Sequence, residues 1–217
     1  GLPYDSDAGR DFASTLTAIL CGDAYWQSAR IAECCAPLGA ATPITQQTEI
    51  SGGACPGFYV NREPFLDVIR MHRAEVNNTG KPTITSPRTT PEPFHVPQLD
   101  ALVAASRHAW DGALAHGERH GFRNSQVTVL APTGTIGFMM DCDTTGVEPD
   151  LALVKYKKLV GGGMIKIVNS TVPSALIKLG YSEDRINAIV SYIDATGTIE
   201  GAPEIKPEHL AVFDCSF

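Results

Sequence analysis

The segment from residue 126 to residue 150 holds the densest set of side chains suited to chemistry. A β-branched run, 127–130, ends at the seven residues Ala131, Pro132, Thr133, Gly134, Thr135, Ile136 and Gly137. Such a run before a proline is typical of a buried strand that gives way to a loop. Glycines let the backbone approach a ligand closely, and threonine hydroxyls can donate hydrogen bonds to phosphate oxygens. The pattern predicts a phosphate-binding loop at 131–137, with a plain tight turn as the alternative.

An acidic stretch follows this loop, with carboxylates at Asp141, Asp143, Glu148 and Asp150. Carboxylates at this density can bind Mg²⁺ or act as general acids and bases. The alternative is a solvated acidic loop in which the side chains make local turns. Cys142 lies between two aspartates, which makes it a poor nucleophile, and we expect it to serve packing.

Two further groups of residues have the types that ligand sites use. His116 and His120 are four residues apart, the spacing of zinc ligands on a helix, but Gly117 and the lack of a nearby third ligand favour a polar, solvated helix end. Lysines at 155, 157, 158 and 166 predict a solvated face, or a complement to an anionic ligand. The glycine loop matches neither the P-loop pattern nor the dinucleotide-binding pattern.

Composition narrows the class of protein. The 217 residues carry a formal net charge of −7, which argues against a partner such as duplex nucleic acid. There is no apolar run of the roughly 18 residues that a membrane span needs, and no signal peptide is visible. Six cysteines without a Cys-x-x-Cys pair predict reduced thiols and a cytoplasmic protein. The chain starts without Met and stops after an apolar segment, so we interpret it as a piece of a longer protein.

Periodicity predicts a helix-rich domain with few strands. The pattern indicates two helices in 6–35, capped by Ser6 or Asp7 and broken at Gly22, and a helix after the cap residue Asn61. Irregular loops are expected at 38–57 and 77–97. The buried stripe of the helix after Asn61 is expected at Phe65, Ile69, His72 and Val76.

The second half is expected to begin with the best helix, 97–120, which Gly121 ends. A strand at 127–130, a short strand or helical turn at 151–154, a glycine corner at 161–163 and helices at 171–179 and 182–195 follow. This incomplete alternation is typical of part of an α/β domain.

These motifs resemble those of the adenosylcobalamin-dependent (class II) ribonucleotide reductases. The similarity is most specific in the runs 131–150 and 153–169, which include Ala-Pro-Thr-Gly-Thr-Ile-Gly and Lys-Lys-Leu-Val-Gly-Gly-Gly. Segments at 1–10, 61–64, 123–126 and 212–215 are similar to that family in the same order. One departure is the loop at 38–57, which is longer than the usual link.

The resemblance implies a fragment of a ten-stranded α/β barrel, incomplete at both ends and covering residues 1–217. It implies that 131–137 hold the phosphates of a ribonucleoside di- or triphosphate, and that adenosylcobalamin is the cofactor. A thioredoxin-like dithiol reductant, dNTP or ATP effectors bound by other parts and a homodimer are the implied partners. The radical cysteine and the shuttle cysteines would lie outside this chain. The six cysteines here are therefore expected to have no catalytic role, and no metal ligand is expected.

The residues alone are also consistent with two functions of another class. A Mg²⁺-dependent phosphohydrolase would need carboxylates that converge on a metal beside the phosphate loop. A non-enzymatic nucleotide-binding module would need only the loop.

Overall fold

The computed structural model describes residues 2–35, 53–78, 96–158 and 161–216. They form two compact units. The helical unit comprises the described residues between Asp11 and Val129, and the C-terminal unit comprises residues 2–10 and those from Leu130 onward. None of the helices in these ranges combines the length and the apolar character that crossing a bilayer requires.

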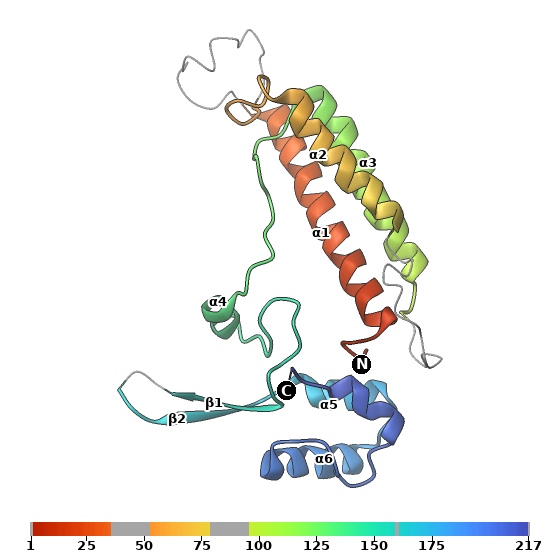
Figure 1. The fold of residues 1–217 in the computed structure, drawn as a ribbon, viewed down its shortest axis with the longest axis vertical. Coiled ribbons are helices and arrows are strands. Elements are labelled where there is room, and N and C mark those ends of the chain that lie inside the picture. Colours follow the sequence, from red (N-terminus) through yellow and green to blue (C-terminus); the bar gives the residue numbers. More distant parts are fainter. Residues whose placement is uncertain (1, 36–52, 79–95, 159–160, 217) are drawn as a thin grey trace. The chain divides into compact units, whose positions relative to one another are not determined.

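The helical unit contains most of α1 (Asp7–Cys34), from Asp11 on, together with α2 (Arg62–Glu75) and α3 (Leu99–His120). A short 3₁₀ turn, η2 (Val76–Asn78), follows α2 (Figure 1). Helices α2 and α3 lie side by side. The helix predicted at 97–120 is confirmed, and Gly121 follows it with φ 73°. The helix predicted after Asn61 is also confirmed, although the Asn61 side chain donates to the Gly57 carbonyl and does not cap it.

The predicted break at Gly22 is wrong, because α1 runs through that position without interruption. Glycine there serves close packing, since an added Cβ would lie 2.9 Å from the indole ring of Trp110. The same indole Nε1–H donates to the carbonyl of Ala18 at 3.0 Å. At the start of the helix Ser6 is the cap, because its Oγ accepts from the Gly9 N–H at 2.9 Å.

Aromatic side chains fill the core of this unit. Phe58 and Phe122 are 2% and 0% exposed, and Phe65 stacks on Phe122 with ring centroids 5.1 Å apart. His72 was expected in the buried stripe of α2; it is solvent-exposed but stacks on Trp110 at 5.0 Å. The buried members of α2 are Leu66 and Ile69.

A buried serine ties the chain after α3 back to α1. Ser28 is 2% exposed, and its Oγ donates to Asn124 Oδ1 and accepts from the Asn124 N–H. The Ser28 carbonyl accepts from the Arg123 N–H. These bonds fix the start of the run that leads to residue 131.

Most of the two predicted irregular loops, 38–57 and 77–97, lies outside the described residues. Within the described part, Gly53 and Cys55 donate backbone hydrogen bonds to Ala32 and Phe122.

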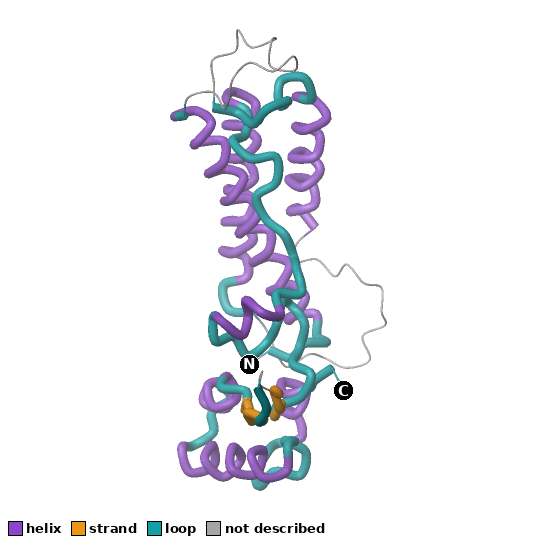
Figure 2. The backbone as a smooth tube through the Cα atoms, turned by 90° about the vertical axis from the view of Figure 1, so that its left-hand side faces the viewer, coloured by secondary structure: helices purple, strands orange, loops and turns teal. Residues whose placement is uncertain are grey.

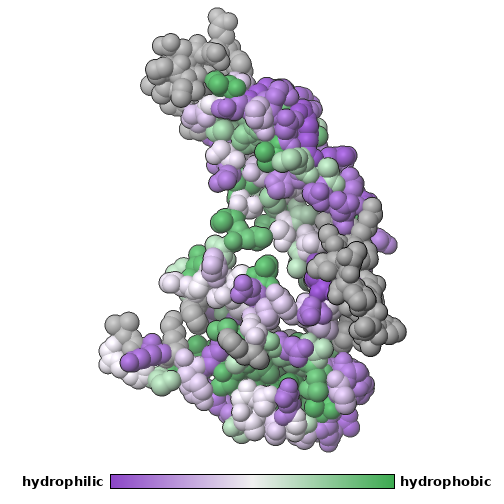
Figure 3. Space-filling model, viewed as in Figure 1, coloured by the Kyte–Doolittle hydropathy of each residue, from purple (hydrophilic) through white to green (hydrophobic). Residues whose placement is uncertain are grey.

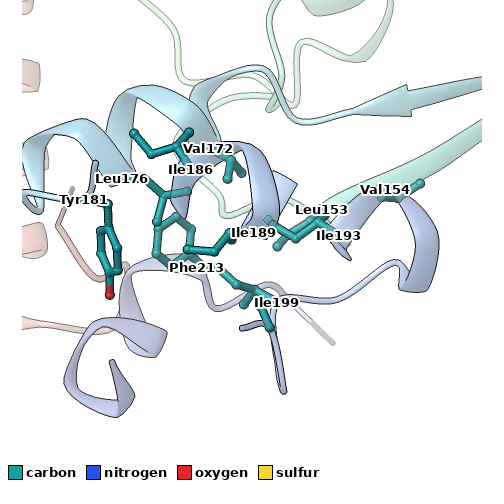
Figure 4. Packing of buried hydrophobic residues seen from close by; sticks show 11 residues of the cluster. Leu153, Val154, Val172, Leu176, Tyr181, Ile186, Ile189, Ile193, Ile199 and Phe213 are labelled. Atoms are coloured by element: carbon teal, nitrogen blue, oxygen red, sulfur yellow. The ribbon is translucent and has the colours of Figure 1, made fainter. Parts of the chain in front are cut away.

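The C-terminal unit contains α4 (Gly134–Met139), strands β1 (Val154–Lys158) and β2 (Met164–Val168), helices α5 (Thr171–Lys178) and α6 (Glu183–Thr196), and the 3₁₀ segment η3 (Pro207–Phe213). The two predicted helices at 171–179 and 182–195 are confirmed. Figure 4 shows Leu176, Ile189 and Phe213 among the side chains that pack between them. On the last helix, Ile186, Ile189 and Ile193 are buried and Val190 is half-buried.

The strand predictions are largely wrong. Residues 127–130 have no regular secondary structure and pair with no strand in the described chain, and Val129 and Leu130 are 82% and 70% exposed. Strands occur in the described ranges only as the β1–β2 ribbon, drawn in orange in Figure 2. In place of the predicted strand or turn at 151–154, β1 begins at Val154 and pairs antiparallel with β2, which was not predicted. A strand forms only where another segment pairs with it, and the pattern of one segment does not report that partner.

The fold is therefore helix-rich with one small sheet, and the described residues close no barrel. Hydrophobic residues also reach the molecular surface (Figure 3). Those in the C-terminal unit include Leu130, Ile136, Met139, Met140, Val147 and Leu151.

Candidate functional site

The predicted phosphate loop is a short extended stretch that turns into α4. Thr133 has φ 45°, and the helix begins at Gly134. Thr133, Gly134 and Thr135 are all exposed. The first N–H groups of a helix have no acceptor within it, so those of residues 134–136 are directed away from the helix body. The loop presents backbone and hydroxyl donors together, rather than burying the threonines in a continuous element.

The two hydroxyls differ in what they contact. Thr133 Oγ1 accepts from the Gly146 N–H at 2.9 Å, which leaves its own hydrogen free to donate. Thr135 is exposed on the first turn of α4. An added Cβ at Gly134 would meet nothing within 4 Å, so no protein contact requires glycine there.

The acidic residues do not converge on a point. Asp143 accepts two hydrogen bonds from Ser170, from its N–H at 2.9 Å and its hydroxyl at 2.6 Å. Asp150 is 8% exposed and contacts Lys155 and Asn169 instead of Ser170. Asp141 and Glu148 are exposed. Across the described residues, no three His, Cys, Asp or Glu side chains are placed to hold a metal ion. The convergence that a Mg²⁺-dependent phosphohydrolase needs is thus not seen in that part of the chain.

Lys155 is the centre of a buried polar network. Its Nζ lies 2.7 Å from Asp150 Oδ1 and donates to the Asp143 carbonyl at 2.5 Å. Its side chain is 19% exposed, so the prediction of a solvated face is wrong for this lysine. Lys166 contacts Asp194 instead, and Lys158 is exposed. The side chain of Lys157 lies outside the described residues.

Asn169 completes the network, and the sequence analysis missed it. It is 7% exposed, and its Nδ2 donates to Asp150 Oδ2 at 3.0 Å. Its Oδ1 accepts from both the N–H and the hydroxyl of Thr171, the first residue of α5. An Asn two residues before a helix is a capping signal that could have identified this role.

A pocket of about 380 Å³ opens beside this network. Its lining includes Asp150, Asn169, Ser174, Lys178 and Cys215, and none of residues 131–137. The pocket and the predicted phosphate loop are therefore separate features of the C-terminal unit.

The histidine pair joins two helices of the helical unit. His116 and His120 of α3 face Glu33 of α1, with Nε2 atoms 3.9 and 3.6 Å from its carboxylate oxygens. The Trp26 Nε1–H donates to His116 Nδ1 at 3.2 Å. That bond occupies the Nδ1 lone pair of the neutral His116 ring, which then carries its proton on Nε2. The pair is a half-buried interhelical contact rather than the solvated helix end we expected.

All six cysteines are free thiols. Cys142 is exposed, so the packing role expected for it is wrong. Burial raises the pKa of the Cys55 thiol. Burial, followed by the negative charges of Asp150 and Asp214, raises the pKa of Cys215.

Comparison with known proteins gives a consistent result. The sequence model of the ribonucleotide reductase barrel domain matches residues 1–217. A vitamin B12-dependent ribonucleotide reductase of Rhodopirellula baltica is 48% identical over 220 residues, covering 100% of this chain and 18% of that protein. Enzymes of the same name from Streptomyces coelicolor and Agrobacterium fabrum are 44% and 46% identical, over 100% and 97% of this chain and 19% and 15% of theirs. The chain thus spans less than a fifth of the length of these three relatives.

Proposed function

Because this chain belongs to the ribonucleotide reductase barrel domain family, we propose that the complete protein is an adenosylcobalamin-dependent ribonucleotide reductase in which residues 131–137 hold the substrate phosphates. Relatives named as vitamin B12-dependent reductases, similar along the whole chain, support the activity and the cofactor. The observation that carries the phosphate role is the group of exposed donors where Thr133 leads into α4.

The proposed contribution of this part of the enzyme is orientation. A ribonucleotide held by its phosphates at 131–137 would present its ribose in a fixed direction, and such positioning can lower a barrier by several kcal/mol. The Thr133 hydroxyl suits this role, because accepting from Gly146 directs its own hydrogen elsewhere. Backbone N–H groups at 134–136 would add donors that carry no side-chain entropy cost.

The cofactor would supply the radical that starts the reaction. The pocket beside Asp150 has about 380 Å³, a size suited to a drug-like ligand rather than to a corrinoid. We therefore assign no residue described here to the cobalamin.

The remaining expectations follow from the same family membership. We propose that the chain is part of the catalytic barrel and that the complete protein works in the cytoplasm. We also propose that it takes its electrons from a thioredoxin-like dithiol and responds to dNTP or ATP effectors through other regions. A homodimer is the proposed assembly.

The test is steady-state kinetics of the complete protein with Thr133→Val and Thr135→Val. A charge-assisted hydrogen bond contributes about 1.5–3 kcal/mol, so each variant should raise KM for the ribonucleotide by roughly tenfold or more. Thr133→Ser, which keeps the hydroxyl, should stay close to the parent. Thr17→Val removes a hydroxyl that bonds only within α1 and serves as the control. Unchanged KM and kcat in both valine variants would remove the loop from the substrate site.

A further inference from the structure

The segment between residues 131 and 150, here called the arch, is held by one hydrogen bond across it and by a second that closes the turn after α4. The Gly146 N–H donates to Thr133 Oγ1 at 2.9 Å, and the Cys142 N–H donates to the Gly137 carbonyl at 2.9 Å. Both bonds link the predicted phosphate loop to the residues that follow it. The position of the loop therefore depends on what fixes the second half of the arch.

Lys155 fixes that half at two points. Its Nζ donates to the backbone carbonyl of Asp143 and pairs with the carboxylate of Asp150, and these two residues bracket Gly146 in the chain. The contacts are largely out of water, since the side chains of Lys155 and Asp150 are 19% and 7% exposed. Screening by solvent is weak at such burial, so both contacts constrain the chain more strongly than a surface pair would.

The body of the C-terminal unit supports the same two aspartates from the other side. Asn169 donates to Asp150 Oδ2, and Ser170 donates twice to the carboxylate of Asp143. Asn169 also accepts from Thr171 at the start of α5, whose Val172 and Leu176 lie in the hydrophobic core. The second half of the arch is thus connected to a packed core.

We propose that Lys155 is a positioning residue for the phosphate-binding loop, acting through Asp143, Asp150 and Gly146 without touching the ligand. The inference rests on the proposed function of residues 131–137. Removing the ammonium group leaves the Asp150 carboxylate buried with one partner fewer, which favours a rearrangement that brings water to it. Gly146 then loses its fixed position, and the Thr133 hydroxyl loses the bond that directs its hydrogen.

The ribbon supplies a matched control. Lys166 on β2 makes the same two kinds of contact, with the carboxylate of Asp194 at 2.6 Å and with the Asp194 carbonyl at 2.5 Å. Lys155 pairs with Ile167 and Lys166 with Tyr156, so the two lysines lie on opposite faces of the ribbon. Lys166→Met removes the same two kinds of bond, from a pair whose side chains are 34% and 58% exposed, and removes no bond to the arch.

The experiment compares Lys155→Met, Lys155→Arg and Lys166→Met in the complete protein, by steady-state kinetics and cobalamin affinity. Lys155→Met should raise KM for the ribonucleotide by about tenfold, the equivalent of about 1.4 kcal/mol, with cobalamin affinity unchanged. Lys155→Arg keeps the charge and should recover most of the loss. Lys166→Met should leave KM within about twofold of the parent value.

Hydrogen exchange at the Gly146 amide gives a readout that does not depend on activity. Exchange should accelerate in Lys155→Met and not in Lys166→Met. Should Lys155→Met fail to fold, Ser170→Ala replaces it, because Ser170 is exposed and its loss should raise KM by about threefold.

The outcomes separate the two proposals. If Thr133→Val raises KM while Lys155→Met and Ser170→Ala leave it within twofold, the positioning role is wrong and the phosphate loop stands. If Gly146 exchange accelerates in Lys155→Met but neither that variant nor Thr133→Val changes KM, the arch is braced as described and the phosphate role is wrong.

Discussion

The core of the helical unit and the arch at 131–150 are held by opposite kinds of interaction. Trp110 and Phe122 are 2% and 0% exposed, and ring-on-ring packing surrounds them. In the arch, Met139 and Met140 are 74% and 65% exposed, and polar contacts of Lys155 hold the chain in place. Helices satisfy their backbone within themselves and need only an apolar face to pack. Outside the short helix α4 the arch has no such internal ladder, so its conformation depends on a few specific polar bonds.

The largest effect should come from removing the aromatic centre of the helical unit. Trp110→Ala deletes a buried indole and its bond to Ala18, which should lower the free energy of unfolding by about 3–5 kcal/mol. Met139→Ala in the arch, where the side chain is exposed, should change it by less than about 0.5 kcal/mol. Urea unfolding followed by circular dichroism measures both. Similar losses in the two variants would contradict the contrast between the regions.

Two glycines test the same contrast without deleting any side chain. An added Cβ at Gly117 would lie 2.1 Å from the ring of Phe122, whereas one at Gly134 would meet nothing within 4 Å. Gly117→Ala should therefore lower stability by about 1–3 kcal/mol, although alanine is the better helix former by about 1 kcal/mol. Gly134→Ala should leave thermal unfolding unchanged and, if the proposed function holds, weaken substrate binding.

The exposed apolar residues that precede the arch in the sequence, Val129 and Leu130, should control self-association of the chain. Val129 and Leu130 are 82% and 70% exposed, so the isolated 217-residue chain should self-associate at micromolar concentration. Val129→Lys with Leu130→Lys should shift its sedimentation toward the monomer and change stability by less than about 0.5 kcal/mol. A monodisperse parent chain would show that this run does not mediate association.

The smallest effect concerns thiol reactivity. Because the pKa of Cys55 and of Cys215 is raised, a smaller fraction of each is thiolate at neutral pH. Alkylation by iodoacetamide at pH 7 should be several-fold slower at these two than at the exposed Cys34 and Cys142, and the rate at Cys55 and Cys215 should keep rising as pH rises toward the raised values. Peptide mass spectrometry at a series of pH values gives the rates, and equal rates at pH 7 would contradict the prediction.

The sequence predicted the helices well, because the buried residues of α3 and α6 recur about every 3.6 residues along one face of each helix. That pattern is visible within a short stretch of sequence. It failed at Gly22 because the ring that packs there, Trp110, comes from a distant segment, and it undervalued Gly117, which packs against the nearby ring of Phe122. It also missed β2 and placed a strand at 127–130, because the residue pattern of one segment does not show whether another segment pairs with it.

The candidate site was predicted as residue types but not as a network. The donors at 133–135 are exposed, and the short helix that begins at Gly134 was not foreseen, while the phosphate role of the loop stays a prediction. The acidic residues and Lys155 were noted separately. Their pairing depends on β1 and β2 bringing Lys155 and Asn169 next to Asp150, which no spacing in the sequence reports.

The three glycines between β1 and β2 restrict the choice of amino acid through their backbone conformation. Gly161, Gly162 and Gly163 have φ values of 99°, 96° and 96°, and a Cβ added to any of them would meet no atom within 4 Å. Space is available for a Cβ, yet the backbone angle disfavours every L-amino acid, and only the achiral glycine adopts it readily. In a saturation-mutagenesis library these three positions should therefore be as intolerant as a packed core while touching nothing. Intolerance to substitution at these positions would then result from the backbone conformation and not from side-chain contacts.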